Sequence, residues 1–308
     1  HNSTLRESKK IGFYGLDVYS LWDSMQIMLA YLEKEDPDTA ELAKQAYRCF
    51  EPYEESDSYA SVFRHSKEGC KEQVVKLLKQ VRQRVHEYDI EKEAALNAEI
   101  NTLVMANAEN YYHAMADLAD ESWNVRDRHM VETLDILMDY HPSDAKAIVW
   151  AHNTHVGDAR ATDMASGGLI NVGQLVRENH YRDGVHVVGF GTYTGSVIAG
   201  RGWGAPMREM EVPEAIEGSV EYRLHQEGND NKMLFLDEPH LKERFSARMG
   251  HRAIGVVYHP ERERGNYVPS KLSDRYDTFI YLDQTKALHP LIIKADTHVL
   301  PETYPFGI

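Results

Sequence analysis

Apolar residues recur at every third or fourth position through much of the first 140 residues, and this spacing is typical of one face of an α-helix. Residues 90–140 contain neither proline nor glycine and exceed an ordinary helix in length, so we expect a break near residues 117–122. The pattern predicts helices over residues 18–32, 39–47, 74–88 and, with that break, 90–140.

Short, continuous apolar runs predict buried strands in the rest of the chain. Two of these runs, residues 11–15 and 147–151, stand on either side of the helical region. From the second run onward, a strand, a helix and a strand follow one another, and this order is typical of parallel strand pairs. The expected strands are residues 11–15, 147–151, 185–190, 233–236, 253–258 and 278–282, with helices at residues 169–179 and 241–249.

These elements predict the α/β fold class, with a mostly parallel central sheet and residues 18–140 as a large helical lobe inserted between the first two strands. Residues 1–17 and 141–308 are expected to form the sheet, so that residues 1–308 make one unit. Because the first apolar strand has no element before it, we expect this unit to be incomplete at its amino-terminal end.

The composition, with 42% hydrophobic and 27% charged residues, is that of an ordinary globular protein. A net charge of -15 argues against a nucleic-acid partner, because phosphate binding needs clustered Lys and Arg. The sequence has no run of about 18 apolar residues, so we expect no membrane span. Cys49 and Cys70 are expected to be two free thiols in a reducing cytoplasm, where we predict the protein to act.

Polar side chains follow three of the predicted strands at their carboxyl ends, where ligands bind in open parallel sheets. Asp17 follows the first strand, and Tyr193 lies between two threonines after the third. These three strand ends would offer side chains to one cleft. The residues that follow the second strand are His152, Asn153, His155 and Asp158.

The two histidines fit general acid–base catalysis, with carboxylates that orient them. A zinc-protease signature needs H-E-x-x-H on a helix, which HNTH does not match, and the sequence has no G-x-S-x-G elbow. Metal binding stays open, since His152 and His155 with Asp158 or Asp17 would supply three ligands. Each histidine could also be a strand-end residue bonded to the backbone.

Asp127 shares a predicted helix face with apolar residues, because Trp123 precedes it by four positions and Leu134 follows it by seven. A carboxylate on a core-facing stripe must be paired or functional. Arg126 and Arg128 point elsewhere, so we expect the partner of Asp127 to come from another element. Glu109, Asn110 and Tyr112 on the preceding helical stretch are comparable candidates for a functional or a structural role.

Five segments resemble the erythromycin esterase family, and in particular its widespread bacterial members labelled as succinoglycan biosynthesis proteins. In order, they are IGFYGLDVYSLWDSM, NAENYYHAM, ESWNVRDRHMVETLDILM, AIVWAHNTHVGDA, and GWGAPM followed by VPEA. The resemblance implies a cytoplasmic α/β hydrolase of its own kind, without a cofactor and with a helical lobe over a cleft. The antibiotic-resistance members of the family open a macrolide lactone by metal-independent attack of water, with a histidine as general base.

Carried over residue by residue, the resemblance implies catalytic positions for His152 and His155, and it matches Asp17 and Asp127 to motif positions. The family's leading motif, Gly-Glu followed by His-Gly, supplies the base histidine and has no equivalent in these 308 residues. The chain therefore resembles the carboxyl-terminal two thirds of a family member. The substrate-binding residues expected around the site are Asn153, Asp158, Tyr193, Glu109, Tyr112 and Arg126, and no metal site is expected.

The predicted function is hydrolysis of a small-molecule ester or lactone, with neither nucleic acid nor membrane as a partner. Two alternatives remain. One is a metal-dependent hydrolase that uses His152, His155 and an aspartate. The other is a non-catalytic ligand-binding or biosynthetic accessory protein, which the missing leading motif favours.

Overall fold

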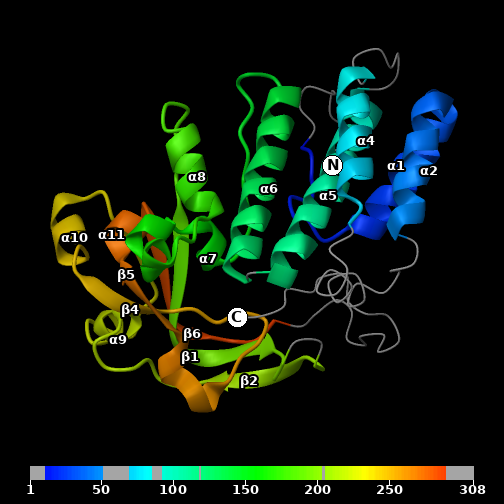
Figure 1. Ribbon diagram of the computed structural model, residues 1–308. Helices are drawn as coiled ribbons and strands as arrows, with labels where there is room; N and C mark the ends of the chain where they lie inside the picture. Colours follow the sequence, from blue (N-terminus) through cyan, green and yellow to red (C-terminus); the bar gives the residue numbers. More distant parts are fainter. Residues whose placement is uncertain (1–10, 51–68, 85–91, 118, 203–204, 289–308) are drawn as a thin grey trace.

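The computed structural model describes residues 11–50, 69–84, 92–117, 119–202 and 205–288. Figure 1 shows a group of helices on one side of the molecule and, on the other, a part that contains the strands and several short helices. This is a mixed α/β architecture, as the sequence predicts. The helices of the first group are α1 (Leu21–Glu35), α2 (Pro37–Phe50), α4 (Lys71–Arg84), α5 (Lys92–Asp117) and α6 (Ala119–Tyr140).

The helical lobe forms because the apolar faces of α1, α2, α4 and α5 meet in one core. On α1, Met25, Met28 and Leu32 are buried at the three- and four-residue spacing of a helix face. Phe50 of α2 and Leu77 of α4 are fully buried in the same cluster. Most of the stability of these helices therefore comes from the packing of amphipathic faces.

The break predicted near residues 117–122 is confirmed, since α5 ends at Asp117 and α6 begins at Ala119. The two helices lie side by side (Figure 1). Helix α6 stands at the border of the lobe, so its other side is available to the strand-containing part.

The main sheet is mixed rather than mostly parallel, which corrects the predicted topology. The strands are β1 (Val188–Ala199), β2 (Arg208–Val212), β3 (Lys232–Phe235), β4 (Arg248–Arg252), β5 (Tyr267–Lys271) and β6 (Thr278–Thr285). In the described main sheet the strand order is β2-β1-β6-β3, and only β1 and β6 pair in parallel. Strands β4 and β5 form a separate antiparallel pair.

Two segments predicted as the first strands, residues 11–15 and 147–151, are not strands. In the part of the chain that the structure describes, neither pairs with a strand, so both lack the ladder partners that a strand requires. Their apolar side chains face solvent, with Phe13 102% exposed and Trp150 89% exposed. The helical lobe is therefore not inserted between two strands of the described sheet.

The prediction was also wrong after residue 240. Residues 253–258 make an isolated bridge, between Val257 and Gly200, instead of a strand. The ladder in this region is formed by β4, which the apolar pattern does not reveal because most of its residues are polar. The helix expected at residues 241–249 correspondingly ends early, at Arg244.

Short helices connect the strands and join them to the lobe. Met130 of α6 packs against Val172, the first residue of α8 (Val172–Asn179), and α8 is the helix that the sequence predicts over residues 169–179. None of the helices within the described ranges has both the length and the apolar character needed to cross a membrane. The α-helices of this part are α7 (Asn153–Val156), α8 (Val172–Asn179), α9 (Val220–His225), α10 (Pro239–Arg244) and α11 (Leu272–Arg275), and the 3₁₀ helices are η4 (Ala159–Ala161), η5 (Asp163–Gly167) and η6 (Pro260–Asn266).

The two cysteines form a disulfide, so the prediction of two free thiols was wrong. Cys49 near the end of α2 is bonded to Cys70, which directly precedes α4, with 5.8 Å between their Cα atoms. The bond joins two helices of the lobe core, and Cys70 is fully buried there. It also removes one of the reasons for expecting a reducing cytoplasm.

Removing the disulfide should lower the free energy of unfolding by about 3 kcal/mol, because a crosslink over 21 positions restricts the unfolded chain. We expect this loss in urea titrations of the double variant Cys49→Ser/Cys70→Ser, and in titrations of the wild type after reduction. The double variant itself should not respond to reductant. Two free thiols in denatured, unreduced wild-type protein would contradict the bond.

Candidate functional site

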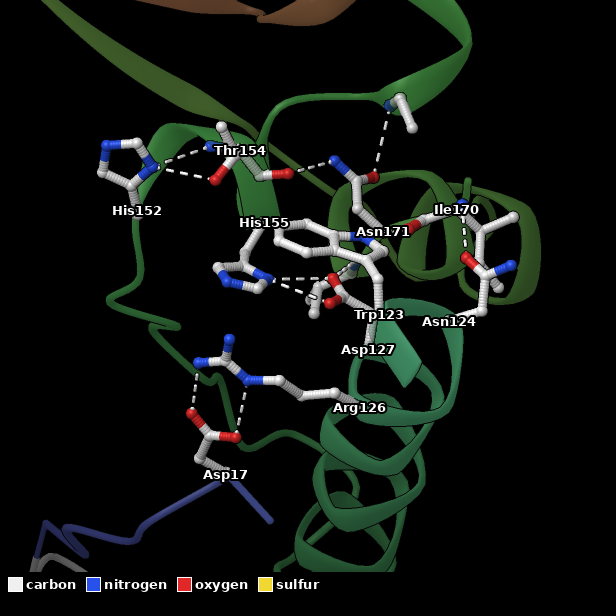
Figure 2. Close-up of polar contacts among 12 residues, drawn as sticks. Asp17, Trp123, Asn124, Arg126, Asp127, His152, Thr154, His155, Ile170 and Asn171 are labelled. Atoms are coloured by element: carbon white, nitrogen blue, oxygen red, sulfur yellow. Dashed lines mark hydrogen bonds and ion pairs between the residues drawn. The ribbon is translucent and has the colours of Figure 1, made fainter. Parts of the chain in front are cut away.

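His155 and Asp127 form a buried pair between two helices. His155 Nδ1, on α7, lies 3.0 Å from each carboxylate oxygen of Asp127, on α6. Asp127 is fully buried and His155 nearly so. The expectation that the partner of Asp127 comes from another element is confirmed. Because Nδ1 donates to the carboxylate, the opposite nitrogen Nε2 is the acceptor, and Figure 2 shows it pointing away from Asp127.

Trp123 covers one face of the His155 imidazole. The ring centroids are 4.6 Å apart and the planes differ by 4°. Trp123 lies one helical turn before Asp127 on α6, so the same side of the helix meets the face and the edge of the imidazole. From the sequence, Trp123 is assigned only to an apolar helix face. Its spacing of four residues from Asp127 is the signal that could have indicated a place beside the partner of Asp127.

Residues 168–172 are held against α6 by polar contacts. Asn124 donates from Nδ2 to the Gly168 carbonyl (3.0 Å) and accepts from the Ile170 N–H (2.9 Å). Asp127 Oδ1 accepts from the Val172 N–H (3.0 Å), at the amino terminus of α8. Since the amino terminus of a helix favours negative charge, α8 helps to stabilise the buried carboxylate.

Asn171 connects α8 to α7, which carries His155, and to the residues that follow α7. Its Nδ2 donates to the Thr154 carbonyl (2.8 Å) and to the Gly157 carbonyl, and its Oδ1 accepts from Ala159 N–H (3.2 Å). The approach is close, because a Cβ atom at Gly173 would lie 1.9 Å from the Val156 carbonyl oxygen. Helix α7 is therefore fixed against the beginning of α8 (Figure 2).

Burial raises the pKa of the Asp127 carboxyl above its ordinary value. The bonds from His155 and the Val172 N–H, together with the charge of Arg126, act in the opposite direction. The carboxylate thus depends on these donors to stay charged in a buried position, and in return it fixes the edge of the imidazole.

Arg126 and Asp17 form a second ion pair beside the first (Figure 2). The guanidinium donates from Nε to Asp17 Oδ1 (3.0 Å) and from Nη2 to Oδ2 (2.7 Å), and it also lies over the Tyr19 ring at 4.6 Å from the centroid. A two-point contact of this kind fixes both side chains. Asp17 therefore holds Arg126, and its own charge is already compensated.

His152 directly precedes α7, the helix that carries His155, and both of its ring nitrogens are hydrogen-bonded. It caps α7, with Nδ1 accepting from the Thr154 N–H (3.3 Å) and lying 2.8 Å from Thr154 Oγ1. Its Nε2 donates to the Ile254 carbonyl (2.8 Å). This arrangement matches the alternative of a histidine bonded to the backbone.

The other predicted substrate-binding residues have contacts of their own. Asn153 bonds through its side chain to both the N–H and the carbonyl of Phe190, which attaches α7 to β1. Asp158 caps η4 and is paired with Arg160 and Arg177. Tyr193 stacks on His225, and Glu109 and Tyr112 are buried on α5. Asn153 and Asp158 are thus held by partners other than His155.

The carboxylates proposed as metal ligands do not converge with the histidines. Asp17 is paired with Arg126, and Asp158 with two arginines. Over the described ranges, no three His, Cys, Asp or Glu side chains are grouped in a way that could hold a metal ion.

The fold and the pair define an α/β protein with a histidine–carboxylate site where the helical lobe meets the remainder. The model of the erythromycin esterase family matches residues 1–285, and the chain belongs to this family.

Solved structures share the fold, each with 16% sequence identity. A succinoglycan biosynthesis protein gives a TM-score of 0.75, over 92% of this chain and 67% of that one. A Bacillus cereus protein also gives 0.75, over 92% and 69%. An erythromycin esterase, EreC, mutated at one histidine and in its open conformation, gives 0.66, over 92% and 71%. At this identity the likeness shows the fold alone.

His129, which the sequence interpretation did not single out, is buried on α6 and lies 3.0 Å, at Nδ1, from Asn107 Nδ2 of α5. Burial lowers its pKa to about 4, from an ordinary value of 6.5. Between pH 6.5 and 4, His129 is therefore protonated in the unfolded chain and neutral in the folded one. The free energy of unfolding should fall by up to about 3 kcal/mol as the pH drops from 6.5 to 4.

Urea titrations across that pH range should show a smaller acid-side loss for His129→Gln than for the wild type. His180→Gln is the control, since burial of His180 is outweighed by its bonds to Asp135 and Asp183, which raise its pKa, so its replacement should not reduce the acid-side loss. An equal loss in the wild type and His129→Gln would contradict a neutral, buried His129.

Proposed function

We propose that this protein is a hydrolase that adds water to an ester or lactone without a metal, and that His155 transfers the proton. The observation that carries the proposal is the His155–Asp127 pair, with Nδ1 bonded to a buried carboxylate. In this arrangement the ring is oriented and the imidazolium is stabilised, as hydrolytic acid–base catalysis requires.

The proposed reaction uses both protonation states of His155. Neutral Nε2 accepts a proton from water as the water oxygen attacks the carbonyl carbon. Asp127 stabilises the imidazolium that results. When the tetrahedral intermediate breaks down, Nε2 returns the proton to the leaving alcohol oxygen, so that ester and water become acid and alcohol.

Arg126 is proposed to stabilise the negative charge that develops on the substrate oxygen. Its guanidinium is close enough to Asp127 to lower the pKa of that carboxyl, and Asp17 fixes its orientation. A fixed cation at a site shielded from water favours a developing oxyanion. His152 is proposed to position the loop rather than to react, because both its nitrogens are bonded.

Membership of the erythromycin esterase family supports this reaction class. The substrate class that we propose is a small-molecule ester or lactone, macrolides included. The disulfide does not fit the cytoplasmic place of action that the sequence predicts, because a reducing compartment would leave Cys49 and Cys70 unbonded. Counting free thiols in protein taken directly from cells tests that prediction.

Hydrolysis should depend on the pair. With erythromycin, followed as the mass gain of one water, and with p-nitrophenyl butyrate, His155→Gln should lower kcat/KM by about 10²- to 10⁴-fold. Asp127→Asn should lower it as well, because the amide can turn a donor toward Nδ1 and disturb the tautomer.

The matched control is His180→Gln, which alters another histidine–aspartate pair outside the site and should leave the rate unchanged. Wild-type rates in both His155→Gln and Asp127→Asn would remove the pair from the chemistry.

Chelation separates this proposal from a metal-dependent hydrolase. Activity should be unchanged after dialysis against EDTA, because the proposed proton transfer uses only His155 and Asp127. A loss that zinc or manganese restores would instead favour the metal-dependent alternative.

A further inference from the structure

The His155 imidazole is restrained in two directions by one helix. Asp127 contacts its Nδ1 edge, and Trp123 lies flat against one face with ring centroids 4.6 Å apart. The edge contact fixes which nitrogen meets the carboxylate. The face contact fixes the plane of the ring, which a bond to a single edge leaves free to tilt.

The indole is itself held in place. Trp123 Nε1 donates to the Ile170 carbonyl (2.7 Å), and Asn124 holds the same residue through its N–H. The stacking surface is therefore anchored by contacts that do not involve His155.

We propose that Trp123 is a positioning residue for His155. Its face holds the ring so that Nδ1 meets Asp127 and Nε2 faces away, and its π electrons stabilise the imidazolium more than the neutral ring. A cation over the face of a tryptophan is attracted by the ring quadrupole. The contact should therefore favour the protonated ring over the neutral one.

Other charges act on the same ring and must be separated from the indole. Asp127 and Arg126 lie on α6, and Asp17 is paired with Arg126. His152 interacts from the amino-terminal cap of α7. From α11, Arg275 donates to the Asn153 carbonyl. The carboxylates favour the imidazolium and the cations oppose it. A substitution at Trp123 removes none of these charged groups, so its effect on His155 can be attributed to the indole.

The test is the titration of His155 followed by NMR on the full chain, with its ring signal assigned by its loss in His155→Gln. Trp123→Leu should lower the His155 pKa by about 0.5 to 1 unit. Trp123→Phe, which keeps an aromatic face but has no indole N–H, should recover most of the shift.

Asn124→Ala is the matched control, because it weakens the attachment of the same Gly168 and Ile170 backbone without touching the stack. Its His155 pKa should equal that of the wild type. An unchanged pKa in Trp123→Leu, or an equal shift in Asn124→Ala, would overturn the proposal. If Trp123→Leu does not fold, the proposal is tested by the His155 titration in Trp123→Phe together with the indole fluorescence of the wild type. That emission should change as His155 takes up a proton in the wild type and show no such change in His155→Gln.

The catalytic consequence rests on the proposed function. The low-pH limb of the rate profile should move down in Trp123→Leu by the same amount as the NMR pKa, with kcat affected more than KM. If the protein hydrolyses no ester, the proposed function fails while the NMR titration still decides whether Trp123 sets the protonation of His155.

Discussion

The buried carboxylate of Asp127 is the constraint on which the rest of the site depends. A carboxylate removed from water needs hydrogen-bond donors, because unpaired burial of a charge costs several kcal/mol. The donors come from two different elements, His155 on α7 and the Val172 N–H at the start of α8. Helices α6, α7 and α8 therefore keep one relative arrangement. The orientation of the imidazole follows from the hydrogen bond that it donates to Asp127.

Helix α6 distributes the groups around this carboxylate because successive side chains point about 100° apart. Trp123 and Asp127, one turn apart, meet the imidazole, whereas Arg126 turns toward Asp17. His129, farther along the helix, reaches toward α5. The same helix packs on the lobe core and on α8, so the site is built into the junction of the two parts.

The helices of the lobe could be predicted from sequence because their packing repeats every three or four residues within one segment. Strand pairing depends on distant neighbours, and residues 11–15 have a strand-like pattern without a described strand beside them. For the site, a carboxylate on an apolar face predicted a remote partner for Asp127, but only the fold identified His155. Trp123 resembled an ordinary core residue, and the disulfide required knowing that α2 and α4 are adjacent.

Gly173 has no side chain, and that absence matters at some distance from the position itself. The Val156 carbonyl occupies the space where a methyl group would stand, so α8 can begin in direct contact with α7. That closeness lets a backbone N–H and an imidazole reach one carboxylate from two directions. The reactivity of a histidine can thus be altered by adding bulk at a place that carries no reactive group, through the spacing of two short helices alone.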